Sequence, residues 1–342
     1  MTKPVILYVG QPILFAHDAW AKFQSSFEIL PYDVKSRDEL VAAFAEGGRY
    51  SRIEGIMRPN MAANMLPPLD EELVALLPST CRIVAYCNHG YDGQDVGALE
   101  RRGIWYCNSA GGCTDSTADV GLFLVIAAFR FTSFCELTLR ENGNANWFDI
   151  QDVVNTAREP GGKVLGIIGM GDVGAAVARR VQAMGMIVHY YNRRRRPDAE
   201  AALGAGVVYH DTVEGLLRAA DCVLLACPHT PETHHLLDGT TISLMKKGSR
   251  VVNIGRGKCI DEEALVEALE DGHIASAGLD VFHDEPVVHP KLLSNKKVTL
   301  LPHIAGSTID ADKNFEEITM KNIEAFFLGD GKPLTPVNNP TV

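Results

Sequence analysis

A glycine-rich turn between two strand-like segments is the feature that most restricts the fold of this chain. Residues 163–174 read K-V-L-G-I-I-G-M-G-D-V-G, an apolar stretch that runs into three glycines at G-x-G-x-x-G spacing. Such a turn leads a strand into a helix whose free N–H groups can bind a pyrophosphate. A second apolar strand, residues 186–191, follows about 20 residues later, as expected for a dinucleotide-binding unit. The cofactor contacts predicted on this turn are Gly169, Gly171, Asp172, Val173 and Gly174.

The loop after this second strand indicates which nicotinamide cofactor can bind. Residues 191–197 read Y-N-R-R-R-R-P, without the acidic residue that usually holds the ribose hydroxyls of NAD. Arg193 and Arg194 are expected to pair with the 2′-phosphate of NADP, because guanidinium groups bind phosphate well. Asn192 can still bond a ribose hydroxyl, and the loop can alternatively be a solvated basic segment. The expected cofactor is therefore NAD or NADP.

Size, charge and cysteine usage limit the class of protein. The chain has 342 residues and 46% apolar content, which favours a globular protein of two domains. Its net charge of -11 makes nucleic acid and anionic membranes poor general partners. The eight cysteines include no C-x-x-C pair, so we expect reduced thiols, no metal centre and a cytoplasmic location. No signal peptide or apolar run long enough to span a membrane is recognised.

Strand-like and helix-like segments alternate along both halves of the chain, a pattern typical of parallel sheets covered on both faces. Before the glycine turn, strands are expected at residues 4–9, 52–57, 82–86 and 104–107. From the turn onward, they are expected at residues 164–168, 186–191, 206–209, 222–226, 249–253, 275–281 and 298–301. The sequence therefore predicts an α/β fold whose second half is a six- or seven-stranded doubly wound sheet.

The segment that joins the two sets of strands has a different character. Residues 117–139 follow an almost continuous apolar helical pattern, which favours burial between domains or in a subunit interface. Residues 141–162 are polar and irregular around Trp147 and Phe148. This second stretch fits either an arm that wraps a partner subunit or a long surface loop.

Three of the later strands end in a charged or titratable residue. Arg256 follows V-V-N-I-G, the acidic run from Asp280 to Glu285 follows A-S-A-G-L, and His303 follows L-L-P. Each residue alone could be a cap, a surface ion pair or a buried histidine. Because ligands of such sheets bind outside the carboxyl ends of the strands, the three together favour hydride transfer to the carbonyl of an anionic substrate.

The same segments resemble the signatures of the D-isomer-specific 2-hydroxyacid dehydrogenase family. The matching motifs are N-H-G-Y-D-G-Q-D at 88–95, C-P-H-T-P-E-T at 227–233, V-N-I-G-R-G at 252–257, G-L-D-V-F-H-D-E-P at 278–286 and L-P-H-I-A-G-S-T at 301–308. The resemblance implies two Rossmann-like domains with the active site in the cleft between them. Residues 1–116 and 307–342 would form the substrate domain. Residues 117–306 would form an inserted dinucleotide-binding domain that carries the helix and arm of a homodimer.

The resemblance also implies the role of each candidate residue. Arg256 would hold the substrate carboxylate as a bidentate pair, assisted by backbone N–H groups near His89 and Gly90. His303, as imidazolium, would protonate the carbonyl oxygen, and Glu285 would favour the charged ring and fix its orientation. The remaining cofactor contacts that it implies are Cys227, Pro228, Thr233, Ile254, Gly255, Asp280 and Gly306.

The substrate is the least constrained part of this interpretation. The overall resemblance is nearest to the fungal D-mandelate dehydrogenases, which implies aromatic or bulky substrates such as D-mandelate and phenylglyoxylate. A glyoxylate/hydroxypyruvate reductase is the alternative, supported by the same arginine-rich loop. An NAD(H)-responsive corepressor-like interaction protein is an alternative from another class, since such members of this fold can keep the arginine, the glutamate and the histidine.

Overall fold

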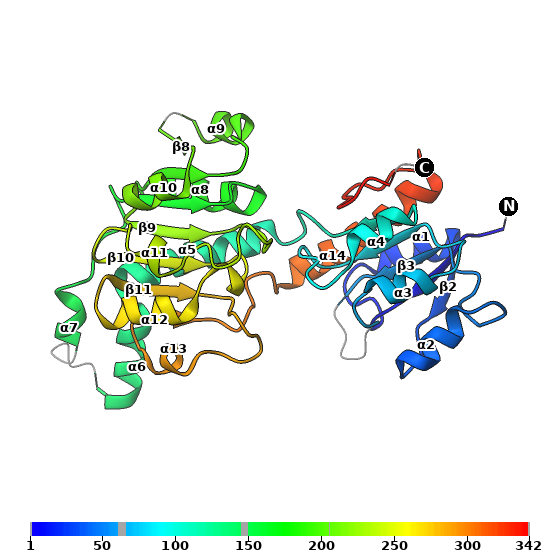
Figure 1. Ribbon diagram of the computed structural model, residues 1–342, viewed down its shortest axis with the longest axis horizontal. Coiled ribbons are helices and arrows are strands. Elements are labelled where there is room, and N and C mark those ends of the chain that lie inside the picture. Colours follow the sequence, from blue (N-terminus) through cyan, green and yellow to red (C-terminus); the bar gives the residue numbers. More distant parts are fainter. Residues whose placement is uncertain (1, 61–65, 145–149, 205, 341–342) are drawn as a thin grey trace. The chain divides into compact units, whose positions relative to one another are not determined.

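The chain folds into two compact α/β units, each built on a parallel sheet (Figure 1). The computed structural model describes residues 2–60, 66–144, 150–204 and 206–340. The first unit is Met1–Cys113 with Ser307–Val342, and the second is Thr114–Gly306. The second unit begins slightly before the crossing expected at residue 117, because Thr114 already opens a helix.

The first unit has a five-stranded sheet in the order β2-β1-β3-β4-β5, with every pair of strands parallel. Its strands are β1 (Val5–Tyr8), β2 (Glu28–Pro31), β3 (Gly55–Arg58), β4 (Ile83–Tyr86) and β5 (Trp105–Cys107). Its helices are α1 (His17–Ser26), α2 (Arg37–Phe44), α3 (Glu71–Leu76), α4 (Val96–Arg101) and α14 (Ile309–Leu328). One apolar cluster covers the face of α2, α3 and α4, and a second covers the face of α1 and α14.

Helix α14 returns from the far end of the chain to complete the first unit. Glu316, 1% exposed, accepts hydrogen bonds from the N–H groups of Leu14 (2.8 Å), Phe15 (3.0 Å) and Ala16 (2.8 Å). Beyond the helix, Asn338 bonds the backbone of Tyr106 and Ile104 at 2.8 and 2.9 Å. The C-terminal segment therefore lies along β5 and is part of the fold.

The second unit has a seven-stranded parallel sheet in the order β12-β11-β10-β9-β6-β7-β8, which confirms the predicted doubly wound fold. Its strands are β6 (Val164–Ile168), β7 (Ile187–Tyr191), β8 (Val208–His210), β9 (Cys222–Leu225), β10 (Ser249–Asn253), β11 (Ile274–Leu279) and β12 (Val298–Leu300). Its helices are α5 (Thr114–Arg130), α6 (Thr132–Asn142), α7 (Gln151–Val154), α8 (Asp172–Ala183), α9 (Pro197–Leu203), α10 (Val213–Ala219), α11 (Gly239–Ile242), α12 (Glu262–Glu270) and α13 (Pro290–Ser294).

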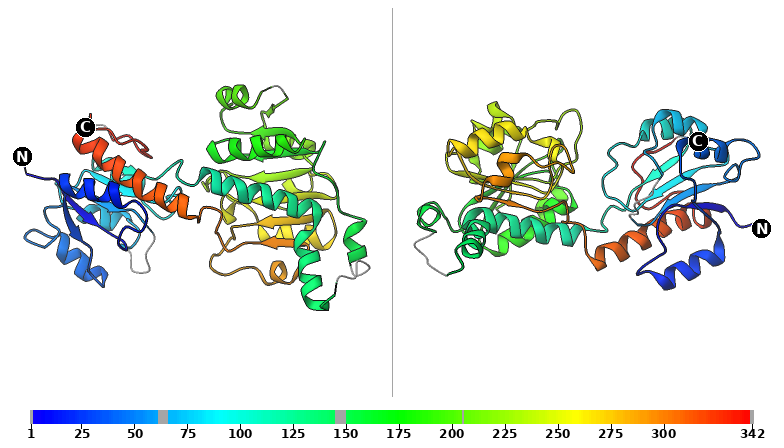
Figure 2. Two further views of the ribbon diagram at one scale, coloured as in Figure 1. Left: turned by 180° about the vertical axis from the view of Figure 1, so that it is seen from behind. Right: turned by 90° about the horizontal axis from the view of Figure 1, so that it is seen from below.

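Two apolar layers sandwich this sheet. Helices α5 and α8 pack on one face, where Leu124 and Val177 belong to the same buried cluster (Figure 2). Helices α10, α11 and α12 cover the other face through Leu216, Ile242 and Leu265. The strands are almost entirely apolar because both faces are buried, as parallel sheets require.

The long helix expected over residues 117–139 is in fact two helices, and that prediction was wrong. Helix α5 ends at Arg130, Phe131 adopts the left-handed conformation with φ 53°, and α6 starts at Thr132. The Phe131 ring is 2% exposed, so burial of the ring accompanies the turn of the backbone. Within the described ranges, no single helix meets the length and hydropathy of a membrane span, whereas α5 and α6 meet them only as a pair bent by 70°.

No disulfide joins any of the eight cysteines, all of which belong to the described residues. Seven of them are buried, and Cys135 is partly exposed. Burial raises the pKa of Cys222 to about 12, so this thiol stays protonated and behaves as a small apolar side chain.

Candidate active site

The three residues predicted to carry the chemistry follow three neighbouring strands of the seven-stranded sheet. Arg256 comes after β10, Glu285 after β11 and His303 after β12. Strand β11 pairs with β10 on one side and with β12 on the other, all in parallel. The three loops therefore leave the sheet at the same edge, the carboxyl ends of the strands.

His303 and Glu285 form a direct hydrogen-bonded pair. The Nδ1 atom of His303 lies 2.7 Å from Oε2 of Glu285, with 48% of the histidine side chain and 36% of the glutamate side chain exposed. The other carboxylate oxygen of Glu285 accepts the N–H of Phe282 at 2.9 Å. Glu285 is thus fixed through one oxygen and orients the imidazole through the other, which directs Nε2 of His303 to the opposite side of the ring.

Asp280 holds the loop that carries His303. Its carboxylate, in a residue only 1% exposed, accepts the N–H groups of Ile304 at 2.9 Å and Ala305 at 3.0 Å. Its carbonyl accepts the N–H of His303 at 2.8 Å, and His303 has φ 56°. Burial raises the pKa of Asp280, opposed by the two N–H donors. These bonds give Asp280 a positioning role that the sequence did not indicate.

The Arg256 loop is braced from below by Asn253. The Asn253 side chain, 1% exposed, donates to the carbonyl of Arg256 at 2.9 Å and accepts the N–H of Gly255 at 3.0 Å. Gly257 then packs on the loop of Glu285, since a Cβ atom there would lie 1.9 Å from the carbonyl carbon of Phe282. Only glycine permits this approach, which brings the Arg256 and Glu285 loops into backbone contact.

The glycine turn has the geometry of a dinucleotide-binding site. Gly169 has φ +104°, and a Cβ at Gly174 would lie 2.2 Å from the carbonyl oxygen of Gly169. A Cβ at Gly171 would meet nothing within 4 Å, and no side chain caps the helix that begins at Asp172. The helix therefore starts with room beside Gly171 and without a side-chain acceptor from its N-cap residue. Asn192 accepts the N–H of Met170 at 2.6 Å and so ties the arginine-rich loop to the turn.

The four arginines of that loop divide into two pairs. Arg195 holds Glu200 at 2.8 and 2.9 Å, and Arg196 holds Asp198 at 2.8 and 3.1 Å. The guanidinium of Arg196 lowers the pKa of Asp198 to about 2. Arg193 and Arg194 are both exposed, and neither has an ion pair with any described residue. The two arginines predicted to contact a cofactor are thus the two without an ion pair to a described residue, and the charge of Arg193 contributes to the lowered pKa of Glu232.

The remaining predicted cofactor residues lie along the same edge of the sheet. Residues 227–237, named here the cofactor loop, follow β9 and are folded back by Thr233, whose hydroxyl donates to the carbonyl of Pro228 at 2.8 Å. A hydrogen bond with Cys259 and burial both raise the pKa of the Cys227 thiol, so this thiol stays protonated. Ile254 is 7% exposed and belongs to the apolar cluster of α5 and α8, and Gly306 follows the His303 loop.

His89 and Gly90, the predicted substrate contacts, belong to the first unit, where they follow β4. The His89 carbonyl accepts the side-chain N–H of Asn108 at 2.6 Å, which fixes the backbone of this loop. Arg58, at the end of β3, donates to the side chain of Asn88 at 3.1 Å and stacks over the Tyr86 ring at 4.4 Å. Arg58 is 7% exposed. Its contribution to this loop was missed, because nothing in the strand pattern distinguishes it.

Comparisons with known proteins agree with this geometry. The family described as D-isomer specific 2-hydroxyacid dehydrogenase, NAD binding domain, matches residues 122–305. A 4-methyl-2-oxopentanoate reductase A from Aspergillus oryzae is 34% identical over 94% of each chain. The chain belongs to the D-isomer specific 2-hydroxyacid dehydrogenases.

Solved structures of other 2-hydroxyacid dehydrogenases match along the whole chain. The holo form of Rhodotorula graminis D-mandelate dehydrogenase matches with a TM-score of 0.93 and 35% identity, over 100% of this chain and 99% of that one. An NADPH-dependent glyoxylate/hydroxypyruvate reductase from Sinorhizobium meliloti, in complex with NADP and malonate, matches with a TM-score of 0.76 and 29% identity, over 98% and 97%. The two-unit fold is therefore the fold of this family.

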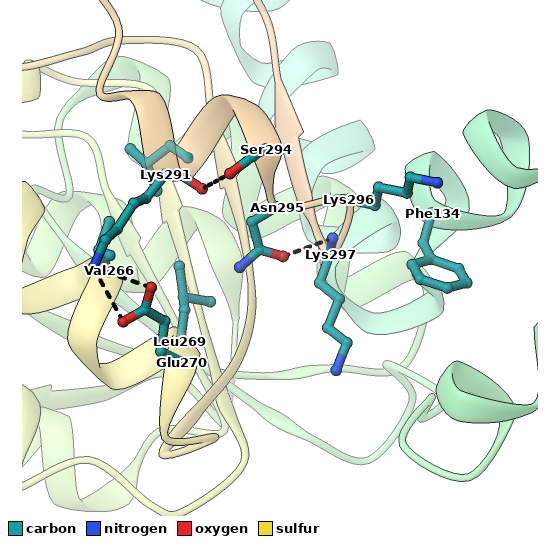
Figure 3. Close-up of a pocket in the computed structure, with 10 residues that line it drawn as sticks. Phe134, Val266, Leu269, Glu270, Lys291, Ser294, Asn295, Lys296 and Lys297 are labelled. Carbon is teal, nitrogen blue, oxygen red and sulfur yellow. Dashed lines mark hydrogen bonds and ion pairs between the residues drawn. The ribbon is translucent and has the colours of Figure 1, made fainter.

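A cavity of about 420 Å³ in the dehydrogenase lies away from these residues (Figure 3). It is formed by α6, α12, α13 and the turn that precedes β12, at the amino end of the sheet. Lys291 at its rim is paired with Glu270 at 3.2 Å. None of the predicted site residues lines this cavity, so the chemistry is assigned to the opposite edge of the sheet.

Proposed function

We propose that this dehydrogenase interconverts a bulky D-2-hydroxy acid and its 2-keto acid, with D-mandelate and phenylglyoxylate as representative substrates. The observation that carries the proposal is the His303–Glu285 pair, 2.7 Å apart, at the sheet edge that also presents Arg256. An acid, its orienting carboxylate and an arginine suit a 2-keto acid because the substrate offers a carbonyl oxygen to protonate and a carboxylate to bind.

Each protein group has a defined task in the reduction of the keto acid. Arg256 binds the carboxylate through two parallel N–H bonds and so fixes the α-carbon. The reduced nicotinamide, when bound, supplies hydride to that carbon. His303 transfers the proton on Nε2 to the carbonyl oxygen and becomes a neutral imidazole. Glu285 remains ionised throughout, stabilises the imidazolium before transfer and holds the ring in place. In the reverse direction the neutral ring removes the hydroxyl proton.

The residues of the second unit fit a dinucleotide. The pyrophosphate would lie against the uncapped first turn of α8, where Gly171 leaves space for it, while Gly169 and Gly174 keep the turn close to the sheet. The cofactor loop, Ile254, Gly255, Asp280 and Gly306 would surround the nicotinamide half. The backbone of His89 and Gly90 in the first unit would complete the substrate site.

Substrate size is the finer part of this proposal. Two of the similar proteins are named for bulky acids, a 4-methyl-2-oxopentanoate reductase and a D-mandelate dehydrogenase. A preference for glyoxylate and hydroxypyruvate is the second candidate, because Arg193 and Arg194 match the NADPH dependence of the Sinorhizobium reductase. An NAD(H)-responsive corepressor-like protein would bind cofactor without turnover.

A panel of keto acids tests the proposed substrate class. We expect the fastest oxidation of reduced cofactor with phenylglyoxylate and 2-ketoisocaproate. The absorbance of the reduced nicotinamide measures this oxidation, with NADH and NADPH tested in parallel. Higher kcat/KM for glyoxylate and hydroxypyruvate would select the second candidate. Tight cofactor binding without turnover of any keto acid would favour the corepressor-like protein.

We expect NADP(H) to be preferred through Arg193 and Arg194. The double replacement of both by alanine should weaken NADPH binding by about tenfold, the loss of a charge-assisted bond, while NADH binding changes little. Fluorescence titration of each reduced cofactor measures this difference. Arg179→Ala is the matched control, since Arg179 is an exposed arginine on α8 of the same unit. Equal losses for NADH and NADPH, or none, would contradict the assignment.

A homodimer formed through α5, α6 and the following arm is the proposed assembly. Phe123 on α5 is 46% exposed, and Leu137 and Leu139 on α6 are 40% and 48% exposed. Exposed apolar side chains of this kind favour burial of the surface in a subunit interface. Trp147 and Phe148, which suggested the arm, lie outside the described residues. Eight cysteines without a disulfide support the proposed cytoplasmic location.

A further inference from the structure

We infer that His235 and His283 form a positioning latch, which ties the cofactor loop to the loop of Glu285 and holds only while at least one ring is neutral. The inference rests on the proposed function and adds two residues to it. Neither histidine is among the predicted site residues. The latch makes the geometry of the bound cofactor and the geometry of the catalytic carboxylate depend on the same bond.

The two rings meet edge to edge across the carboxyl end of the sheet. The Nε2 atoms of His235 and His283 are 3.0 Å apart, within hydrogen-bonding distance, and the ring centroids are 5.1 Å apart. Both side chains are partly buried. His235 follows Thr233 of the cofactor loop by two positions, and His283 precedes Glu285 by two positions. A change at either ring is therefore transmitted to predicted site residues through very short stretches of chain.

Backbone bonds hold the base of each ring. The N–H of His235 donates to the carbonyl of Lys258 at 2.9 Å, and the N–H of His283 donates to the carboxylate of Glu262 at 2.8 Å. Gly257 is packed against the backbone of Phe282. Backbone contacts thus join the loop after β9 to the loop after β10, and the loop after β10 to the loop after β11. The imidazole pair joins the loop after β9 directly to the loop after β11.

The protons of the pair can be assigned from its surroundings. Nδ1 of His283 lies 3.0 Å from a carboxylate oxygen of Asp284, and therefore carries a proton. In the neutral His283 ring, Nε2 then accepts the bond that His235 donates. One further proton can enter at Nδ1 of His235 without loss of this bond. A second would place two N–H donors and two positive charges face to face, which opens the latch.

The groups around the pair carry both signs of charge. The His234 ring stacks on His235 at 4.1 Å and bonds His229 at 3.1 Å. Desolvation first, and then repulsion from the adjacent cations, lower the pKa of His234. The positively charged or chargeable groups around the pair are His229, His234 and Lys258, and the negatively charged groups are Glu262, Asp284 and Glu285.

Two substitutions at His283 separate the effect of losing the hydrogen bond from the effect of protonating the ring. Glutamine can still accept from His235 and does not titrate, whereas alanine removes the bond. We would measure the dissociation constants of NADH and NADPH at about pH 7.5 and about pH 5.5, on either side of the ordinary histidine pKa of about 6.5. Chelator in the buffer prevents a metal ion from bridging the rings. His210→Gln is the matched control, because His210 on β8 forms a similar 3.0 Å pair with His189 on β7.

The latch predicts a different pattern for each protein. The wild type should lose about fivefold in cofactor affinity between the higher and the lower pH, the worth of one hydrogen bond, beyond any change seen in His283→Gln. His283→Ala should already be about fivefold weaker at the higher pH and show no such extra loss. His210→Gln should follow the wild type.

The same measurements can overturn the inference. Wild-type affinity in His283→Ala, or the same pH dependence in wild type and His283→Gln, would show that the pair positions nothing. A parallel change in His210→Gln would reduce it to a general effect of histidine loss. If the wild type bound neither cofactor at either pH, the proposed function would fail and the latch with it, whereas normal wild-type binding with unaffected variants removes the latch alone.

Discussion

Replacing His303 by asparagine should reduce kcat for the 2-keto acid by about 10²- to 10⁴-fold, the usual range for loss of a general acid. The physical reason is that no other titratable side chain is bonded to Glu285 among the described residues, so the proton has no substitute donor. Stopped assays of product formation at saturating cofactor measure the effect. Cofactor affinity should be retained, because His303 follows β12 whereas the glycine turn follows β6.

Two further measurements separate proton transfer from a general loss of structure. The thermal unfolding midpoint of His303→Asn should stay near that of the wild type, since 48% of the side chain is exposed. Glu285→Gln should cause a smaller loss of kcat, because a neutral partner stabilises the imidazolium less than a carboxylate does. Wild-type turnover by His303→Asn would remove the residue from proton transfer.

Replacing Arg256 by lysine should lower kcat/KM by about one to two orders of magnitude, mainly through a higher KM. The ammonium group retains the charge but loses the planar pair of donors that a carboxylate engages. Initial rates over a wide range of keto acid concentration separate the two constants. Arg218→Lys, an exposed arginine on α10, is the control for the substitution itself.

The constant that changes in Arg256→Lys identifies the role of Arg256. If the carboxylate is its ligand, the affinity for a 2-keto acid should fall while the affinity for NADPH stays constant. A loss confined to kcat, with unchanged KM, would instead indicate a contribution to the chemical step. Unchanged kinetics would assign substrate binding to other groups.

The strand pattern predicted that the three candidate catalytic residues follow successive strands of one sheet. Arg256, Glu285 and His303 are far apart in sequence, but each follows an apolar run whose burial on both faces requires a parallel sheet. The distance of 2.7 Å between His303 and Glu285 could not be predicted, because it depends on the loop that Asp280 anchors. The sequence assigned Asp280 only a cofactor contact.

Other features depend on contacts that no local pattern encodes. The break at Phe131 interrupts a sequence that is apolar on both sides of it, so its helical periodicity continues through the bend. The division of the arginine loop depends on Glu200 and Asp198, which take the third and fourth arginines and leave the first two exposed. Likewise, His235 and His283 come from separate loops, and only the packed sheet edge brings them together.

The anchoring of α14 sets the order in which the chain can fold during synthesis. Glu316 binds the backbone around Ala16 from 300 residues further along the chain, and Met320 and Ile323 cover the face that β1, β3 and β4 present to them. Only α1 covers that face until the ribosome has made the whole of the inserted unit. The inserted unit, by contrast, has all its residues as soon as Gly306 emerges. Folding therefore finishes first in the middle of the chain, and the unit that contains the N-terminus is the last to close, which is the reverse of the usual N-terminal-first order.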